Sequence, residues 1–420
     1  MGVKQRPKTY IAFEGGKRQV MTKFLEKERE LPVLYDGYDI AVVGGGIAGV
    51  SAALAAARAG KRVLLLERMF ALGGLGTLGL VTIYLPLCDG MGHQVSYGIT
   101  EELLRLSISH GWERDYPDTW LQPGKEHGAQ RFQVRYNAQV FAVLLEQLLQ
   151  KEGVDLLYGT AVCGTIRQGN KVTALIVENK DGRSAIPVQG VVDASGDADI
   201  FALSGVETAL YKRGNKMAAW YYETLNGRNQ LCMVGASDVL PEDGDSQEPE
   251  QIGTGRISGI DSRETTEWLL RSHSISLERF LVKGDVSETH SLSVLPTIPQ
   301  LRMTRRMKGR YTLDEGEDHA RFEDSVGMVG DWRKRGPVFE IPMGTLCSEE
   351  LVNVTAAGRC ISVTDAMWDI TRVIPAAAVT GQAAGVMLAI SSDTAKLSAS
   401  AVQQELRRQG VRLHLDEIDN

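Results

Sequence analysis

Two kinds of apolar pattern run through the first half of the chain and predict its elements. Tyr38–Val43 and Arg62–Glu67 are predicted strands, because they contain the continuous apolar runs Ile40–Val43 and Val63–Leu66. Ile47–Ala59 between them is long enough for a helix. Apolar residues at helical spacing predict two further helices, at Thr100–His110 and Asn137–Lys151. Four more strands are predicted downstream, with an Asp-Gly turn before the last: Val154–Tyr158, Ala161–Arg167, Val172–Glu178 and Ala185–Val192.

The second half of the chain divides by composition. Residues 200–350 are more polar and include a long loop at Leu240–Gly255, and the apolar pattern returns in a strand at Val352–Ala356 and an alanine-rich helix at Val373–Ile390. We therefore predict an α/β fold. A parallel sheet flanked by helices, with a β-meander, forms a discontinuous nucleotide-binding domain that carries an inserted α+β cap.

The predicted division follows this pattern. Residues 1–37 are a polar lead with a short helix around Met21–Arg29, and residues 38–199 are the first part of the nucleotide-binding domain. The insert covers 200–350, the return of the nucleotide-binding domain covers 351–395, and a C-terminal helix and tail cover 396–420.

The turn after the first strand carries the sharpest motif. Gly44, Gly46 and Gly49 form G-x-G-x-x-G between a strand and a helix, where the first glycine permits a tight turn, the second lets a pyrophosphate approach and the third allows close packing. The helix N-terminus directs free amides at the phosphates. Glu67 ends the next strand, where a carboxylate accepts hydrogen bonds from a ribose. This spacing predicts a dinucleotide site.

Features further along favour FAD over NAD. Gly73–Gly79 supplies a second bare backbone, which a flavin nucleotide needs because it continues past the first loop. Val191–Asp199 and Val354–Ser362 are apolar strands that end in small residues. The helix that follows has Pro375 in its first turn and a stripe of small residues for close packing, Ala377, Gly381 and Gly385. An NAD dehydrogenase leaves this C-terminal set unexplained.

With these motifs, the chain resembles the FAD-dependent oxidoreductases of the broad glutathione-reductase-like flavoprotein group. The segments that carry the resemblance come in that family's order: the glycine motif, "GITEEL", "DASGDAD", "LRMTRRMKGRYTL", "FEDSVG" and "AAGRCIS…R…GQAAG". The resemblance covers about residues 29–390, and its C-terminal motifs are the most restrictive. It implies a Rossmann-type FAD-binding domain, FAD as the cofactor, and redox chemistry. It does not imply a substrate.

The resemblance also implies which residues hold FAD. Gly44, Gly46, Gly49 and Glu67 bind the ADP half, and Val162 lies where similar proteins hold the adenine. The remaining expected cofactor contacts are Arg68, Gly73, Gly74, Thr77, Ala194, Gly196, Gly358, Arg359, Ile374, Pro375 and Ala376.

Candidates for the chemistry are less specific, because the flavin itself exchanges the hydride. Arg372 either binds an anionic substrate or charge on the flavin, or belongs to a structural ion pair. Asp365 is either a base or the ion-pair partner of Arg372, and we expect the partner. Arg302 opens a basic run to Arg310, which is a solvated face, an anion-binding wall or, least expected, an RNA contact.

Other reactive side chains near the expected flavin path are His93, Cys88 and Tyr84. His93 offers a proton relay or an attachment point for the flavin, and Cys88 offers an attachment point, although we expect no covalent link. Tyr84 is a candidate for the substrate cavity. No histidine pairs with another His or Cys at metal-ligand spacing, so no metal site is expected.

Composition indicates the class of protein and its compartment. The chain has 420 residues, is 43% hydrophobic and 24% charged, and carries a net charge of −7, which argues against nucleic-acid binding by the chain as a whole. Five scattered cysteines favour a reducing cytoplasm, and polar residues within Val373–Ile390 favour a buried helix over a membrane span. We expect a cytoplasmic flavoenzyme that exchanges a hydride with a small polar or anionic molecule. An RNA-modifying flavoenzyme and an electron-relay subunit are the alternatives, and the electron acceptor and any homo-oligomer stay open.

Overall fold

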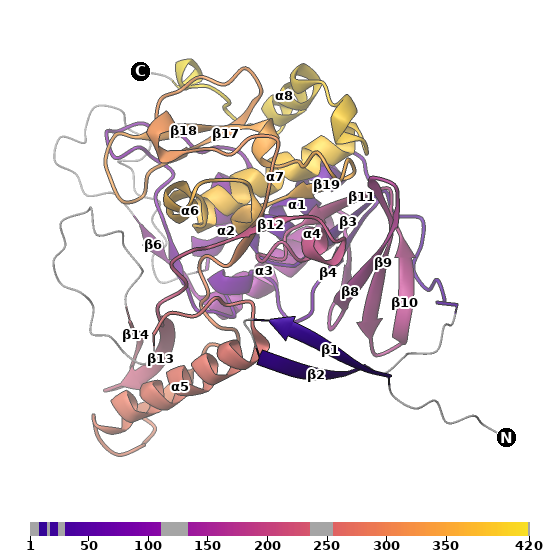
Figure 1. Ribbon diagram of the computed structural model, residues 1–420. Coiled ribbons are helices and arrows are strands. Elements are labelled where there is room, and N and C mark those ends of the chain that lie inside the picture. Colours follow the sequence, from indigo (N-terminus) through magenta and orange to yellow (C-terminus); the bar gives the residue numbers. More distant parts are fainter. Residues whose placement is uncertain (1–7, 15–16, 24–29, 111–132, 236–254, 419–420) are drawn as a thin grey trace.

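A five-stranded parallel sheet forms the centre of the molecule (Figure 1). The computed structural model describes residues 8–14, 17–23, 30–110, 133–235 and 255–418. The strands lie in the order β19-β11-β3-β4-β7. Their bounds are Val354–Ala356, Gly190–Asp193, Ile40–Val43, Val63–Leu66 and Asp155–Leu157. Four of the five are buried along their whole length, as continuous apolar runs predict for a parallel sheet covered on both faces. The predicted α/β fold class is confirmed.

Two helices that are far apart in sequence pack directly on each other beside this sheet. They are α1 (Ile47–Arg58) and the alanine-rich α7 (Ile374–Ile390), which begins with Pro375 in its first turn. A Cβ atom on Gly381 would lie 2.2 Å from the carbonyl oxygen of Ala48, and one on Gly385 would lie 2.2 Å from that of Ala52. The small-residue stripe therefore does what its spacing predicts, since only glycine allows the two backbones to come this close.

A three-stranded antiparallel meander lies beside the parallel sheet (Figure 1). It consists of β8 (Ala161–Gln168), β9 (Lys171–Asn179) and β10 (Gly182–Pro187). The single strand expected at Ala185–Val192 is wrong. The chain leaves the meander at Pro187 and enters the parallel sheet at Gly190. Proline has no backbone N–H to continue the hydrogen bonds between strands, so pairing with β9 ends at Pro187. The residues that follow then pair in the parallel sheet.

The insert contributes a second, smaller layer. Its sheet has the order β14-β13-β15, with α5 packed against it. The elements from 199 to 342 are α4 (Asp199–Leu203), β12 (Thr208–Leu210), β13 (Ala219–Leu225), β14 (Arg228–Val234), α5 (Ser262–Leu281), β15 (His290–Val294), β16 (Arg305–Met307), β17 (Ser325–Gly330) and β18 (Val338–Pro342). The loop expected at Leu240–Gly255 lies outside the described residues except for Gly255. The domain division itself stays a prediction.

The remaining elements complete the chain. They are β1 (Lys8–Glu14), β2 (Lys17–Lys23), β5 (Ile83–Tyr84), α2 (Ile99–Ile108), β6 (Val134–Arg135), α3 (Ala138–Lys151), α6 (Asp365–Thr371) and α8 (Ala399–Arg408). Short 3-10 helices lie at Gly74–Gly76, Glu315–Glu317, Met343–Thr345, Gly358–Cys360, Thr394–Lys396 and Leu415–Glu417.

The helix expected around Met21–Arg29 is wrong where the structure describes it. Met21–Lys23 belongs to β2, which pairs antiparallel with β1, and residues 24–29 lie outside the described residues. A Gly-Gly pair separates the two strands in the sequence and is typical of two-residue hairpin connections. Cross-strand pairing here outweighs the local helical pattern.

The expected buried helix is α7, whose residues from Pro375 to Ala389 are almost all buried. Within the described ranges, no single helix combines the length and apolar content that a membrane span requires. Helices α6 and α7 meet that requirement only as a pair, and they are bent by 92° where they meet.

Candidate functional site

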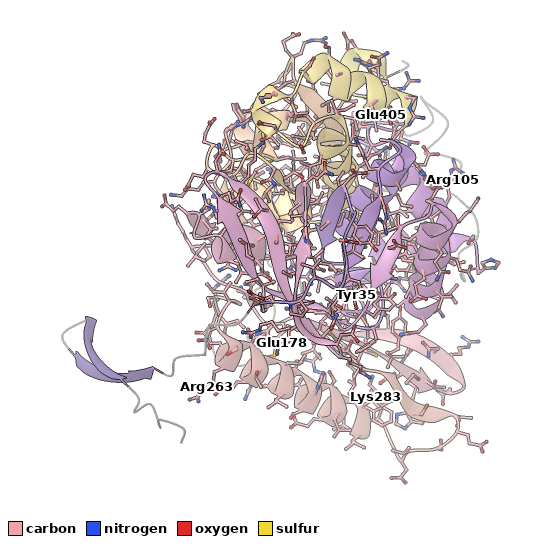
Figure 2. The ribbon with its side chains drawn as sticks, turned by 90° about the vertical axis from the view of Figure 1, so that its right-hand side faces the viewer. Tyr35, Arg105, Glu178, Arg263, Lys283 and Glu405 are labelled. Atoms are coloured by element: carbon pink, nitrogen blue, oxygen red, sulfur yellow. The ribbon has the colours of Figure 1, made fainter. Side chains whose placement is uncertain are left out.

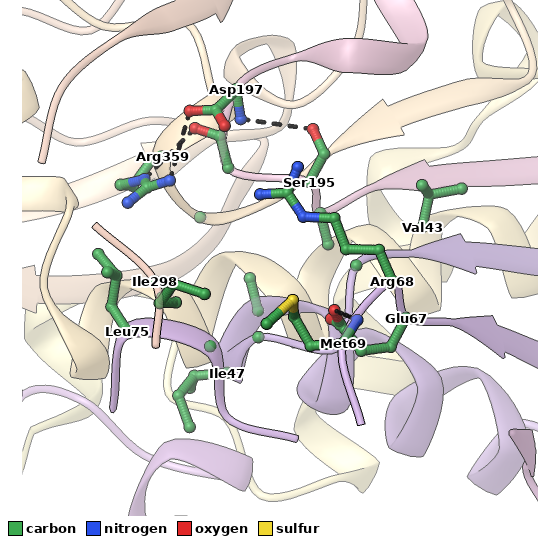
Figure 3. A pocket seen from close by; sticks show the side chains of 18 of the residues that line it. Val43, Ile47, Glu67, Arg68, Met69, Leu75, Ser195, Asp197, Ile298 and Arg359 are labelled. Carbon is green, nitrogen blue, oxygen red and sulfur yellow. Dashed lines mark hydrogen bonds and ion pairs between the residues drawn. The ribbon is translucent and has the colours of Figure 1, made fainter. Parts of the chain in front are cut away.

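A pocket lies where the strands of the parallel sheet end. Val43 at the end of β3, Leu66 at the end of β4 and Ala194 just after β11 contribute to its wall, as do residues at the N-terminal ends of α1 and α7 (Figure 3). Crevices at the carboxyl ends of parallel strands are where open α/β sheets bind ligands. Position alone makes this pocket the candidate site.

The first glycine loop forms one side of the pocket. Gly44 has a φ of +101°, and a Cβ atom there would lie 2.5 Å from the carbonyl oxygen of Ala194. A Cβ atom on Gly49 would lie 1.8 Å from the carbonyl oxygen of Gly44, so Gly49 serves helix–strand packing. Gly46, the N-cap of α1, differs because a Cβ atom there would meet nothing within 4 Å. Its bare Cα therefore borders open space at a helix N-terminus, where an anion binds well.

The second glycine segment lies directly against the first. The N–H of Gly73 donates to the carbonyl of Gly45 at 2.8 Å, and a Cβ atom on Gly74 would lie 3.1 Å from the Cα of Gly46. Gly73 and Gly74 have φ angles of +98° and +55°, which favour glycine. Two bare backbones, about thirty residues apart in sequence, thus share one part of the pocket wall, which offers a ligand close approach to both.

Glu67 closes this side of the pocket. Its Oε2 accepts from the N–H of Gly45 at 2.6 Å and its Oε1 from the N–H of Met69 at 2.7 Å, so the carboxylate is fixed in place (Figure 3). The side chain lines the pocket although it is only 7% exposed as a residue. Each carboxylate oxygen keeps a free lone pair, so Glu67 can still accept hydrogen bonds from hydroxyl groups of a ligand.

On the opposite side of the pocket, the side chain of Arg359 makes contacts with the Gly196–Asp197 loop and with Leu301. Its Nε donates to the carbonyl of Gly196 at 3.3 Å, its Nη1 donates to the carbonyl of Leu301, and its Nη2 pairs with Asp197 at 3.5 Å (Figure 3). A Cβ atom on Gly196, whose φ is +86°, would lie 2.3 Å from Nη2. Arg359 therefore fixes the pocket wall through its hydrogen bonds instead of presenting a free cation.

Asp193, at the end of β11, supports the pocket wall without lining it and was not among the expected site residues. It is fully buried, and burial together with the nearby charge of Asp199 raises its pKa to about 6. Its Oδ1 accepts from the hydroxyl of Ser195 at 2.6 Å and its Oδ2 accepts from the N–H of Ile200 at 2.9 Å. Asp193 thus holds the "ASGDAD" loop under the pocket. An acidic residue ending an apolar strand was the available signal.

At the N-terminus of α7, the ion pairs differ from those expected. Arg372 lines the pocket, but its partner is Asp369, with Nε 2.7 Å from Oδ1. Asp365 pairs instead with Arg306 at 3.6 Å and does not line the pocket, so the expected Asp365–Arg372 pair is wrong. Asp369 stands three residues before Arg372, and Asp365 stands two helical turns before it at the start of α6. Asp369 also pairs with Arg333 at 3.5 Å.

The basic side chains of the run that begins at Arg302 pair with different acidic residues and do not gather on one surface. Arg305 pairs with Asp199 at 2.7 Å and Lys308 pairs with Glu207. Arg310 contacts Glu349 at 3.4 Å and donates to the carbonyl of Thr394 at 2.9 Å. Arg302 is 8% exposed and lies outside the pocket wall, with its Nη2 3.4 Å from the side-chain oxygen of Gln300. This geometry favours structural roles for these cations over an anion-binding wall.

Most of the expected cofactor contacts border the pocket, and some do not. Those on its wall are Gly44, Gly46, Glu67, Arg68, Gly73, Gly74, Val162, Ala194, Gly196, Gly358, Arg359 and Ile374. Those behind it are Gly49, Thr77, Pro375 and Ala376. Thr77, for example, is buried and donates its hydroxyl to the carbonyl of Leu72. Several apolar wall residues were not among the expected contacts, including Leu75 and Leu78 in the second glycine segment, and Ile298, Pro299 and Leu301.

The other reactive side chains lie away from the described pocket wall. Tyr84 is fully buried and donates to the carbonyl of Thr100 at 2.7 Å, which contradicts its expected place in a substrate cavity. His93 Nδ1 lies 2.9 Å from Asp89, and Cys88 is buried. Neither His93 nor Cys88 lines the pocket. No group of three or more His, Cys, Asp or Glu side chains arranged to hold a metal occurs among the described residues.

Comparison with known proteins gives matches of very different extent. A stretch of 72 residues is 33% identical to the thioredoxin reductase of Ureaplasma parvum, spanning 17% of this chain and 23% of that protein. A solved geranylgeranyl bacteriochlorophyll reductase-like protein from Thermoplasma acidophilum aligns over 91% of this chain and 85% of its own, with 16% identity and a TM-score of 0.45. The p-nitrophenol 4-monooxygenase of Pseudomonas putida aligns over 89% and 84%, with 13% identity and a TM-score of 0.42. None of these similarities bears on the substrate.

The family match is much more extensive than these pairwise matches. The model of the FAD dependent oxidoreductase family matches residues 39–247 and 245–409, which together cover most of the chain and all of the pocket wall. The chain belongs to the FAD-dependent oxidoreductase family, and FAD is its cofactor.

Proposed function

We propose that the pocket binds FAD and that the protein is an oxidoreductase acting on a small organic molecule. The observation that carries this proposal is the pairing of Gly46 with Gly73 and Gly74, which leaves a helix N-terminus and two bare backbones open to a pyrophosphate. Glu67 is fixed beside them and can accept from ribose hydroxyls. On this proposal, Arg68 and Val162 border the adenosine part of the cofactor.

The N-terminus of α7 supports a place for the reactive part of the cofactor. When bound, the flavin supplies the hydride acceptor or donor. The chain's own contribution is positive charge: the amide end of α7 at Ile374 and the guanidinium of Arg372 both stabilise negative charge on a ligand. Asp369 holds Arg372 in position and balances part of its charge.

The substrate proposed is a small molecule with a polar group and an apolar body. Ile298, Pro299 and Leu301 of the insert supply an apolar wall, which excludes water and favours an apolar body. Arg372 supplies the polar contact, for a neutral oxygen or a carboxylate. All five cysteines are free, which is consistent with the proposed cytoplasmic location.

The geometry weighs against the proposal's first rival, an RNA-modifying flavoenzyme. That reading depends on a free basic face, and Arg305, Lys308 and Arg310 are instead paired with acidic or carbonyl partners. The second rival, an electron-relay subunit, differs in a measurable way, because a relay flavin is reduced by a protein partner and not by a small molecule.

The test begins with an absorbance scan of the purified protein before and after acid precipitation. Flavin bands that move into the supernatant are expected for FAD held without a covalent bond. Colour that stays with the pellet would indicate attachment and make Cys88 and His93 the residues to substitute. Anaerobic titration with alcohols, amines and carboxylates then follows, and bleaching of the flavin by one of these classes identifies the class of the substrate. A protein that FAD cannot reconstitute would refute the proposal.

A further inference from the structure

Helix α5 presents an apolar stripe to solvent. Leu270, Leu277 and Leu281 are 61%, 45% and 49% exposed, although burial of a leucine side chain is favourable. At roughly 100° per residue, these three and Ser274 lie within about 60° of arc, in a stripe about 16 Å long. The stripe lies on the side of α5 opposite its buried face, and that buried face carries Trp268, Ser272, Ser276 and Phe280. Figure 2 shows α5 along one edge of the molecule, between Arg263 and Lys283.

The spacing of the stripe matches a helix-to-helix seam. Leu270, Ser274, Leu277 and Leu281 are separated by four, three and four residues, the spacing of apolar positions where two helices pack lengthwise. A surface helix that only faces water carries polar residues at such positions. The stripe is therefore suited to a second helix.

The pattern is complementary to itself when the second helix is a copy of α5 running antiparallel. Leu270 then faces Leu281 of the second copy, and Ser274 faces Leu277, so each small residue is opposite a large one. The symmetry axis passes between Ser274 and Leu277, and every contact occurs twice. Self-complementarity of this kind is what a two-fold interface requires.

The charges beside the stripe agree with the same arrangement. Arg271 and Glu278 follow Leu270 and Leu277 by one residue each, so they lie on the same side of the stripe. In the antiparallel arrangement, Arg271 of each copy faces Glu278 of the other. Both are exposed, and neither has an ion-pair partner among the residues that the structure describes. Opposite charges at such flanking positions set the partner and the orientation.

We propose that this protein forms a two-fold dimer through antiparallel contact of α5 with α5 of a second copy. A lipid surface fits the helix less well, because interfacial helices carry mainly Lys and Arg beside the apolar face, and here Glu267 and Glu278 flank it. The inference concerns a face of the insert away from the described pocket wall and does not depend on FAD binding.

The mass of the protein in solution tests the dimer. Sedimentation velocity of the full chain is expected to give twice its 45.9 kDa mass at micromolar concentration. Leu277→Glu places two carboxylates at the centre of the seam and is expected to give a monomer that keeps its flavin spectrum. Val143→Glu is the matched control, because Val143 is 50% exposed on α3, and it should leave the dimer intact.

Charge reversal tests the identity and orientation of the partner. Arg271→Glu alone or Glu278→Arg alone creates two like-charge contacts and is expected to raise the dimer dissociation constant by roughly tenfold. The double variant restores both contacts in a dimer of copies and is expected to return within about threefold of the unmodified protein. A monomeric wild type would overturn the proposal, as would a dimer that Leu277→Glu leaves intact or a double variant as weak as the singles. Binding of a monomeric wild type to anionic vesicles would assign the stripe to lipid instead.

Discussion

Two parts of the pocket wall are built by opposite means. Around Gly44, Gly46, Gly73 and Gly74, the wall is backbone, and it works because side chains are absent. Around Arg359 and Arg372, the wall depends on long side chains, each held by an acidic partner. We call these the backbone wall and the charged wall. The backbone wall depends on the absence of side chains, whereas the charged wall depends on which acidic and basic side chains meet in the folded chain.

The largest effect is expected from the charged wall. Asp369→Asn leaves Arg372 and Arg333 without their shared carboxylate, where all three side chains are at most 6% exposed. Breaking a buried pair costs about 3 to 5 kcal/mol of unfolding free energy, which urea denaturation measures. Asp365→Asn is the matched control, because Asp365 is 28% exposed and pairs at 3.6 Å, and it should cost less than about 1 kcal/mol. Equal costs for the two variants would show that Asp369 is not the structural partner.

The packing behind the backbone wall is expected to be nearly as sensitive. Gly381→Ala places a methyl group 2.2 Å from the carbonyl oxygen of Ala48, so α7 must move away from α1 at a cost of about 3 kcal/mol. Gly164→Ala is the control, since its methyl group meets only the side chain of Ile176 at 3.2 Å and should cost less than about 1 kcal/mol. Thermal or urea unfolding of both variants decides the point, and unchanged stability of Gly381→Ala would refute the tight α1–α7 contact.

The buried carboxyl group of Asp193 is expected to make the stability of the protein depend on pH. Its pKa is about 6 in the folded protein against 3.8 as an ordinary aspartate, so the folded state binds the extra proton. Its contribution to stability is therefore fully present below about pH 4 and is lost as the pH rises through about 6, by at most about 3 kcal/mol.

The variant Asp193→Asn removes this titration and keeps an acceptor for Ser195. The difference in unfolding free energy between the variant and the wild type should therefore change from pH 4 to pH 6 and stay constant above pH 7. A difference that does not vary with pH would contradict the burial of an ionisable Asp193.

The backbone wall was predictable from sequence because its requirement is local. A turn with a positive φ favours glycine, so Gly44, Gly73 and Gly74 are recognisable in the sequence as glycines. Gly46 has an ordinary φ of −68° and is recognisable from its place in the G-x-G-x-x-G motif. The small-residue stripe on α7 is recognisable from its glycine and alanine residues in the same way. The parallel sheet is predicted by the continuous apolar runs of its strands.

The charged wall was not predictable in the same detail. Asp365 and Asp369 are the same residue type one helical turn apart, and the one that meets Arg372 depends on where α6 begins and bends into α7. Ile298 and Pro299 reach the pocket from the predicted insert and belong to no motif, because any apolar side chain of suitable size can form such a wall. The switch of sheets after Pro187 likewise depends on pairing with distant strands.

The most direct test of the central claim is a titration of cofactor-free protein with FAD, followed by flavin fluorescence, for the wild type and Gly46→Ala. A Cβ atom at Gly46 meets no protein atom within 4 Å, so the variant should unfold at the same urea concentration as the wild type. Its methyl group occupies the space assigned to the pyrophosphate, and FAD affinity should fall at least about tenfold, or 1.4 kcal/mol. Equal FAD affinity in the two proteins would contradict the assignment of the backbone wall to the cofactor.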